Sequence, residues 1–170
     1  MRKNSQRIKK ITLMALFTSL TLLLAAVERF IPPIVPEIPG IRMGLPNIII
    51  ITIIYRFGLE DAIIVSLARM LIATMVFGDV QRLLYSFVGA ALSLAVMGIL
   101  KKIDFLSIVG VSVAGAIMHN LGQTLVAIWL WKTPQLGYYM ILLTVAGTVS
   151  GIFIGLCGAL LHKRLKKIKM

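Results

Sequence analysis

The sequence predicts an all-α integral membrane protein, a bundle of six transmembrane helices in one domain that spans residues 1–170. Composition is the first reason, because 59% of the chain is hydrophobic and only 14% is charged, against about 45–50% and about 25% in soluble proteins. The second reason is the mean hydropathy of +0.96, which indicates a chain whose solvent is lipid. The third is a series of six apolar runs separated by polar turns.

The first apolar run, 8–30, follows a basic segment. It is longer than the apolar part of a signal peptide and further spans follow, so we interpret it as a retained helix. Turns rich in glycine, proline and charge separate the later runs. These runs cover 45–57, 62–77, 83–100, 106–131 and 138–161.

The second run is too short to cross a bilayer alone. Its 13 residues would make a helix of about 20 Å, against about 30 Å of hydrocarbon. Four prolines and a glycine precede it between Pro32 and Gly40, and Pro46 suits the start of a helix. Irregular backbone at membrane depth is tolerated only beside protein or a water-filled cavity, so we expect this loop to form part of a site.

The charges predict the topology. Eighteen Lys and Arg against six Asp and Glu give a net charge of +12, and 13 of the 18 basic residues would lie on the side that six spans assign to both termini. The excess of basic residues places both termini in the cytoplasm, with basic tails at about 1–10 and 162–170. We therefore expect a multi-pass protein of the cell membrane whose basic tails meet the lipid bilayer, and no nucleic-acid partner.

Two predicted spans carry polar side chains that would be costly in lipid. Arg69 shares a helical face with Ser66 and small residues, and a charge at mid-bilayer costs at least about 2.5 kcal/mol. His119, Asn120 and Gln123 fall within five residues of the fifth run. We interpret both stripes as lining a ligand cavity. The alternatives are that Arg69 pairs with helix carbonyls and that the other three make hydrogen bonds between helices.

Small residues recur at intervals of four in two runs. Gly147, Gly151 and Gly155 predict close helix packing. Ala15 and Ser19 form a weaker version in the first run, which could pack internally or face another membrane protein. Tyr139 belongs to a group of aromatic residues near the last turn, which is typical of the membrane interface, although stacking on a ligand is an alternative.

The sequence contains no motif of an enzyme that acts alone. It lacks a Gly-x-x-x-x-Gly-Lys-Ser/Thr phosphate loop, a local carboxylate cluster for magnesium and a Gly-x-Ser-x-Gly nucleophile motif. Its two histidines fall on different runs. We therefore expect no catalytic residue, no cofactor and no metal site, and any ATP-driven work must come from another chain.

A set of short motifs resembles a known family: Glu28-Arg29, Pro39-Gly40-Ile41-Arg42-Met43-Gly44-Leu45-Pro46-Asn47, Ser66-Leu67-Ala68-Arg69, Tyr85-Ser86 and His119-Asn120-Leu121-Gly122-Gln123. It is similar to the Gx transporter family, which is also labelled heptaprenyl diphosphate synthase component I. That family is grouped with the substrate-binding S components of energy-coupling factor (ECF) transporters. The resemblance covers about 11–161, and Pro46 departs from the alanine expected there.

The resemblance implies an S component of an ECF-type importer for a vitamin-like or other small micronutrient, with an anionic compound as one candidate. Its partners would be two ATPase subunits and a transmembrane coupling protein that docks on Ala15 and Ser19. The second label implies an alternative, a non-catalytic membrane subunit associated with heptaprenyl diphosphate synthase in isoprenoid or menaquinone biosynthesis. A flavin, a quinone or isoprenoid precursor and other vitamins all stay open as substrates. The ligand-binding candidates are Glu28, Arg29, Arg42, Asn47, Arg69, Tyr85, His119, Asn120, Gln123 and Tyr139.

Overall fold

The computed structural model describes residues 2–30, 44–78 and 80–167. Helix accounts for 89% of the structure, and these residues contain no strand. The six α-helices are α1 (Arg2–Phe30), α2 (Asn47–Arg56), α3 (Leu59–Phe77), α4 (Val80–Leu100), α5 (Ile108–Trp131) and α6 (Met140–Lys166), and a short 3-10 helix, η1 (Pro134–Tyr139), precedes α6. The prediction of an all-α chain with six helices is confirmed.

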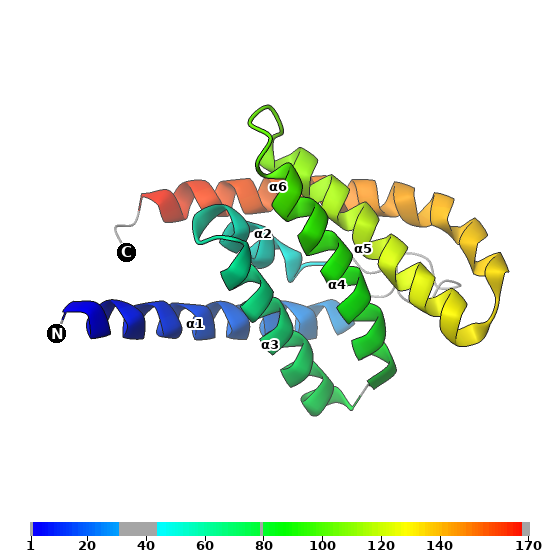
Figure 1. Cartoon of the computed structure of the whole chain (residues 1–170), viewed down its shortest axis with the longest axis horizontal. Helices are drawn as coiled ribbons and strands as arrows, with labels where there is room; N and C mark the ends of the chain where they lie inside the picture. Colours follow the sequence, from blue (N-terminus) through cyan, green and yellow to red (C-terminus); the bar gives the residue numbers. More distant parts are fainter. Residues whose placement is uncertain (1, 31–43, 79, 168–170) are drawn as a thin grey trace.

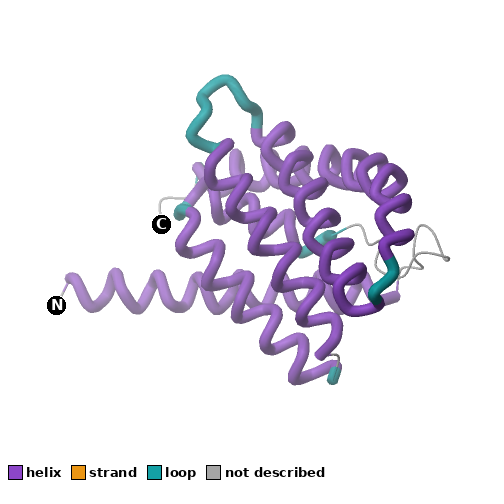
Figure 2. Tube along the Cα trace, turned by 45° about the vertical axis from the view of Figure 1, so that its right-hand side comes forward, coloured by secondary structure: helices purple, strands orange, loops and turns teal. Residues whose placement is uncertain are grey.

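The helices lie in one bundle (Figures 1 and 2). Figure 1 shows α1 and α6 running along the long axis of the molecule, with α3, α4 and α5 oblique to them and both chain termini at the same end. We call this the terminal end of the bundle. The start of α1 extends beyond the other helices in Figure 2, and the side chains of residues 6–12 are all exposed. Which side of a membrane the terminal end faces stays a prediction.

Helix α2 forms the centre of the core. All six residues from Ile49 to Ile54 are buried, and Ile53 and Ile54 are fully enclosed. Helices α1, α3 and α6 pack around it. A helix that is apolar on all sides is stable only when protein or lipid surrounds it, and here protein does. Helix α2 has ten residues, too few to cross a bilayer alone, but protein rather than lipid surrounds it inside the bundle.

Four described helical segments are long and apolar enough to cross a membrane: Gln6–Phe30, Leu83–Leu100, Ile108–Trp131 and Pro134–Lys166. Helix α3 has 19 residues but carries Glu60 and Asp61 in its first turn and Arg69 near its middle. The structure is thus that of a helical membrane protein. Four helices have the properties of membrane spans by themselves, whereas α2 and α3 depend on their neighbours.

Glycines allow α6 to approach α5 closely, as the four-residue spacing predicts. A Cβ added at Gly151 would lie 2.7 Å from Cα of Val113, and one added at Gly155 would lie 2.7 Å from Cα of Val109. Real Cβ atoms do not come this close to a backbone, so only glycine fits. Gly147, Gly151 and Gly155 are all buried. The packing interpretation of this stripe is confirmed, and α5 has its most extensive contacts with α6 and α4.

Candidate functional site

Polar side chains gather where α1 ends and α2 begins, opposite the terminal end of the bundle. Glu28 lies near the end of α1 and is only 7% exposed. Its Oε1 accepts a hydrogen bond from the backbone N–H of Gly44. A buried carboxylate requires such compensation, because an isolated charge is costly to remove from water. We call the group around it, Glu28, Gly44, Asn47, Arg69 and His119, the polar cluster.

Gly44 links the start of α2 to the end of α1 through its hydrogen bond to Glu28. Its φ of 74° lies in the left-handed region, which favours glycine. A Cβ at this position would lie 3.0 Å from Nδ2 of Asn47 and 3.4 Å from the side chain of Ile154. The carbonyl of Gly44 also accepts from the N–H of Asn47 at 2.8 Å. Glycine is therefore required for the chain to enter α2 while its N–H bonds Glu28.

Arg69 brings a cation into the polar cluster from α3. Its Nε is buried and has no hydrogen-bond partner among the described residues. The carboxylate of Glu28 attracts the guanidinium. Across residues 2–30, 44–78 and 80–167 the only direct ion pair is the one between Lys10 and Asp61, so the attraction between Glu28 and Arg69 acts at longer range. Arg69 thus retains a buried donor that no described residue satisfies.

His119 lies where α5 crosses α4 at backbone contact. A Cβ added at Gly89 would lie 3.0 Å from Cε1 and from Nδ1 of the imidazole, and one added at Gly122 would lie 2.8 Å from Cα of Gly89. The positive charge of Arg69 acts on the imidazole, so the two side chains share one region. Arg69 and His119 therefore lie near enough for their charges to interact, although α3 and α5 share no extensive contact.

Asn120 and Gln123 differ from His119 in their surroundings. Nδ2 of Asn120 donates to the carbonyl of Leu143 in α6 at 2.8 Å, and a Cβ on Gly147 would lie 2.7 Å from this nitrogen. The amide of Asn120 therefore bridges two helices, which supports the alternative of a structural hydrogen bond. Gln123 is half-buried. A direct role of either residue in ligand binding stays a prediction.

Two other candidates make contacts between helices. The guanidinium of Arg29 lies 3.5 Å from the ring centroid of Phe77, which joins the ends of α1 and α3 by a cation–π contact. The hydroxyl of Tyr85 accepts a hydrogen bond from Nε1 of Trp131 at 2.9 Å and joins α4 to α5. Both residues stabilise the end of the bundle that holds the polar cluster.

The remaining candidates lie away from the polar cluster or outside the described residues. Tyr139 lies in η1 and is 45% exposed, as expected for a ring at the membrane interface. Arg42 falls outside the described residues. Ala15 and Ser19 are exposed on α1, and Oγ of Ser19 donates to the carbonyl of Ala15 at 3.0 Å. The small face of α1 therefore points away from the bundle, so internal packing does not account for it.

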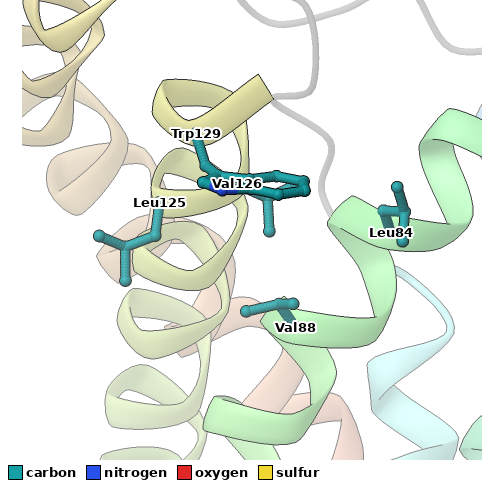
Figure 3. A pocket seen from close by; sticks show the side chains of 5 residues that line it. All are labelled: Leu84, Val88, Leu125, Val126 and Trp129. Atoms are coloured by element: carbon teal, nitrogen blue, oxygen red, sulfur yellow. The ribbon is translucent and has the colours of Figure 1, made fainter. Parts of the chain in front are cut away.

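An apolar groove of about 270 Å³ lies between α4 and α5 (Figure 3). Leu84 and Val88 come from α4, and Leu125, Val126 and Trp129 come from α5. In Figure 3 the tryptophan ring extends from α5 across the groove towards α4. The apolar side chains that line the groove can contact hydrocarbon but cannot compensate a charged group, in contrast to the polar cluster.

The polar cluster offers a guanidinium, a carboxylate, an imidazole and an amide in a largely apolar interior. Such a combination can orient a small molecule that carries an anionic group beside neutral hydrogen-bonding atoms. Sequence reasoning did not assign Gly44 a role, although its motif drew attention, because the φ angle and the bond to Glu28 exist only in the folded chain. Within the described residues no group of three His, Cys, Asp or Glu side chains could hold a metal ion.

Comparison with known proteins assigns the chain to a family. A family profile described as heptaprenyl diphosphate synthase component I matches residues 17–161. This match covers every described helix at least in part, and the chain belongs to this family. No curated protein and no solved structure matches the chain.

Proposed function

We propose that this member of the heptaprenyl diphosphate synthase component I family is the membrane-embedded substrate-binding S component of an ECF-type importer. Its substrate is a vitamin-like or other small micronutrient with an anionic group. The observation that carries the proposal is Arg69, a cation in an apolar bundle whose buried Nε has no hydrogen-bond partner among the described residues. A buried donor without a partner costs about 1–3 kcal/mol, more for a charged group, which a ligand oxygen would recover.

The surroundings of Arg69 support an anionic ligand. A guanidinium binds carboxylate or phosphate through two parallel N–H donors, and Nε is one of the donors that such a fork uses. Glu28 already accepts from Gly44, so part of its charge is balanced by the backbone. His119 adds an imidazole that feels the charge of Arg69, and Asn47 adds an amide beside Gly44, whose N–H bonds Glu28. Together they favour a ligand with one anionic group and further polar atoms.

The partners follow from the same proposal. The sequence has no phosphate loop, so two ATPase subunits and a transmembrane coupling protein would supply the energy. Ala15 and Ser19 are exposed on α1, and the Ser19 hydroxyl is satisfied within its own helix. Their small side chains leave a flat surface on which another helix can pack. The chain would lie in the cell membrane with both termini in the cytoplasm.

The family description favours a second candidate function. In this alternative the chain is a non-catalytic membrane subunit associated with heptaprenyl diphosphate synthase in isoprenoid or menaquinone biosynthesis. The apolar groove between α4 and α5 would then offer a surface for a prenyl chain. This candidate requires a soluble synthase as partner and no ATPase.

The two functions are separated by what copurifies with the protein. We would extract the tagged chain from its native membrane in mild detergent and identify by mass spectrometry the bound proteins and any small molecule released on denaturation. A coupling protein with two ATPases is expected. Recovery of a prenyl synthase without an ATPase would overturn the importer proposal and support the second candidate.

Variants test whether the small molecule and the coupling protein bind to different surfaces of the chain. Arg69→Ala should release the small molecule and keep the protein partners. The double variant Ala15→Leu/Ser19→Leu should lose the coupling protein and keep the small molecule. Ala91→Leu/Ala95→Leu is the matched control, since both alanines are exposed on α4 and share the same spacing. If the α4 control releases the partner as readily as the α1 variant, the docking assignment is wrong.

A further inference from the structure

Basic side chains without a carboxylate partner among the described residues gather at the terminal end of the bundle, far along the helices from the polar cluster. Helix α2 ends at Arg56, α4 ends just before Lys101, and His162 lies near the end of α6. Tyr55 stands between them: its ring centroid is 6.1 Å from that of His162 and 5.6 Å from Nζ of Lys101. We call Tyr55, Arg56, Lys101 and His162 the basic cluster.

The charges of the basic cluster converge on one imidazole. The positive charges of Lys166, Arg56 and Lys101 all act on His162. Lys101 also donates to the carbonyl of Ile54, one of the carbonyls that α2 leaves unpaired at its end. Cations near helix C-termini are stabilised by the helix dipole, but each terminus contributes only about half a negative charge. The helix ends therefore offset these cations only in part.

Acidic residues at this end do not neutralise the positive charge of the basic cluster. Asp61 is bound to Lys10 at 2.8 Å. Glu60 and Asp104 are exposed, and no ion pair joins either of them to the basic cluster in the part of the chain that the structure describes. Repulsion among like charges at short range costs free energy unless an anion is present.

Three buried polar atoms of the basic cluster lack partners among the described residues: the Tyr55 hydroxyl, Nε of Arg56 and Nδ1 of His162. A hydroxyl, a guanidinium N–H and an imidazole N–H can all donate to the oxygens of one anion. A phosphate has several acceptor oxygens, so it can take these donors together. The transport proposal does not use these side chains.

We propose that the basic cluster binds a phosphate group at the membrane interface. This chemistry is shared by an anionic phospholipid headgroup, held where the helix ends meet the bilayer surface, and by a soluble phosphate compound. The bound phosphate places one anion among Arg56, Lys101 and His162 and satisfies donors that α2 and α6 leave unpaired. It thereby stabilises the contact between the ends of α2, α4 and α6.

The test uses the purified full-length protein in neutral detergent. Its thermal unfolding midpoint is measured against inorganic phosphate and, separately, against added phosphatidylglycerol, with phosphatidylcholine as the zwitterionic comparison. Native mass spectrometry then counts the retained lipid. We expect a saturable rise of the midpoint. A rise with phosphatidylglycerol alone identifies a lipid headgroup, and a rise with inorganic phosphate alone identifies a soluble phosphate ligand.

Arg56→Gln should weaken the apparent affinity about tenfold, because a charge-assisted hydrogen bond is lost. Tyr55→Phe removes only a hydroxyl and should weaken it about threefold, which keeps the test usable if Arg56→Gln does not fold. Lys102→Gln is the matched control, an exposed cation beside Lys101 at the same end, and should change the affinity less than about twofold. The proposal is overturned if neither probe stabilises the wild type, or if Lys102→Gln loses as much affinity as Arg56→Gln.

Discussion

The two ends of the bundle differ in how their buried charges are compensated. In the polar cluster, Glu28 and Arg69 bring opposite charges together, and the backbone of Gly44 supplies a further donor. In the basic cluster, Arg56 and Lys101 act on His162 together with the neighbouring Lys166, and among the described residues helix ends alone oppose these charges. Opposite charges can remain in an apolar interior without a ligand, whereas like charges are tolerated only near solvent, headgroups or a counter-ion.

The comparison suggests separate roles. An internally compensated site can open and close around a substrate without a large change in its own charge. An uncompensated site at the membrane interface attracts anions continuously. Under the two proposals, the polar cluster would hold a transient ligand and the basic cluster a resident phosphate.

Removal of the cation should affect the polar cluster most. Arg69→Met leaves the carboxylate of Glu28 buried without its attracting charge, and we expect a loss of unfolding free energy on the order of 2 kcal/mol. The double variant Glu28→Gln/Arg69→Met should regain most of this loss, because no charge then remains. Reversible unfolding in mixed detergent measures each step of the cycle. Additive losses in the double variant would show that the two charges are not coupled.

Gly44→Ala should cost about 1–2 kcal/mol from backbone strain, and more from contact with Asn47, which lies 3.0 Å from the added Cβ. Gly78→Ala is the matched control, since Gly78 also has a positive φ of 69° but open space around its added Cβ. The difference between the two variants measures the contact alone. Equal unfolding free energies would mean that the chain around Gly44 adapts without disturbing the polar cluster.

Asn120→Ala should cost about 1 kcal/mol, because the hydrogen bond to Leu143 across α5 and α6 is lost. Retention of the copurified small molecule should not change if the amide is purely structural. Thr124→Val serves as a control on the same helix, since the Thr124 hydroxyl bonds only its own helix at Asn120. Release of the small molecule by Asn120→Ala in a folded protein would restore Asn120 to the binding site.

Lys10→Gln should have the smallest effect, about 0.5 kcal/mol, because Lys10 is 58% exposed and its buried partner Asp61 lies in the first turn of α3, where the helix dipole also stabilises a carboxylate. Added sodium chloride should remove most of this difference by screening. The Arg69→Met loss should persist at high salt, since its surroundings exclude ions. The unfolding free energies of both variants are measured at low and at high ionic strength and compared. A salt-sensitive Arg69→Met loss would contradict the assignment of the two ends.

Several features were predictable because they depend on neighbours in the sequence. The glycine spacing of α6 predicted close packing, and the brevity of 45–57 predicted a helix that could not span alone. The sequence also indicated that Arg69 and His119 should face the interior. It could not show that Asn120 turns its amide to Leu143, because periodicity places a residue on a face but does not choose its partner.

Hydropathy and helix breakers act locally along the chain, so the amino-acid order was enough to predict the class of solvent, the number of helices and their approximate limits. Which polar groups meet depends instead on how the helices pack. Glu28 and Gly44 are 16 positions apart, and Lys101 and Ile54 are 47 apart. Such pairs exist only in the folded bundle, where α1, α3 and α6 enclose α2, since burial is what makes each polar group require a partner.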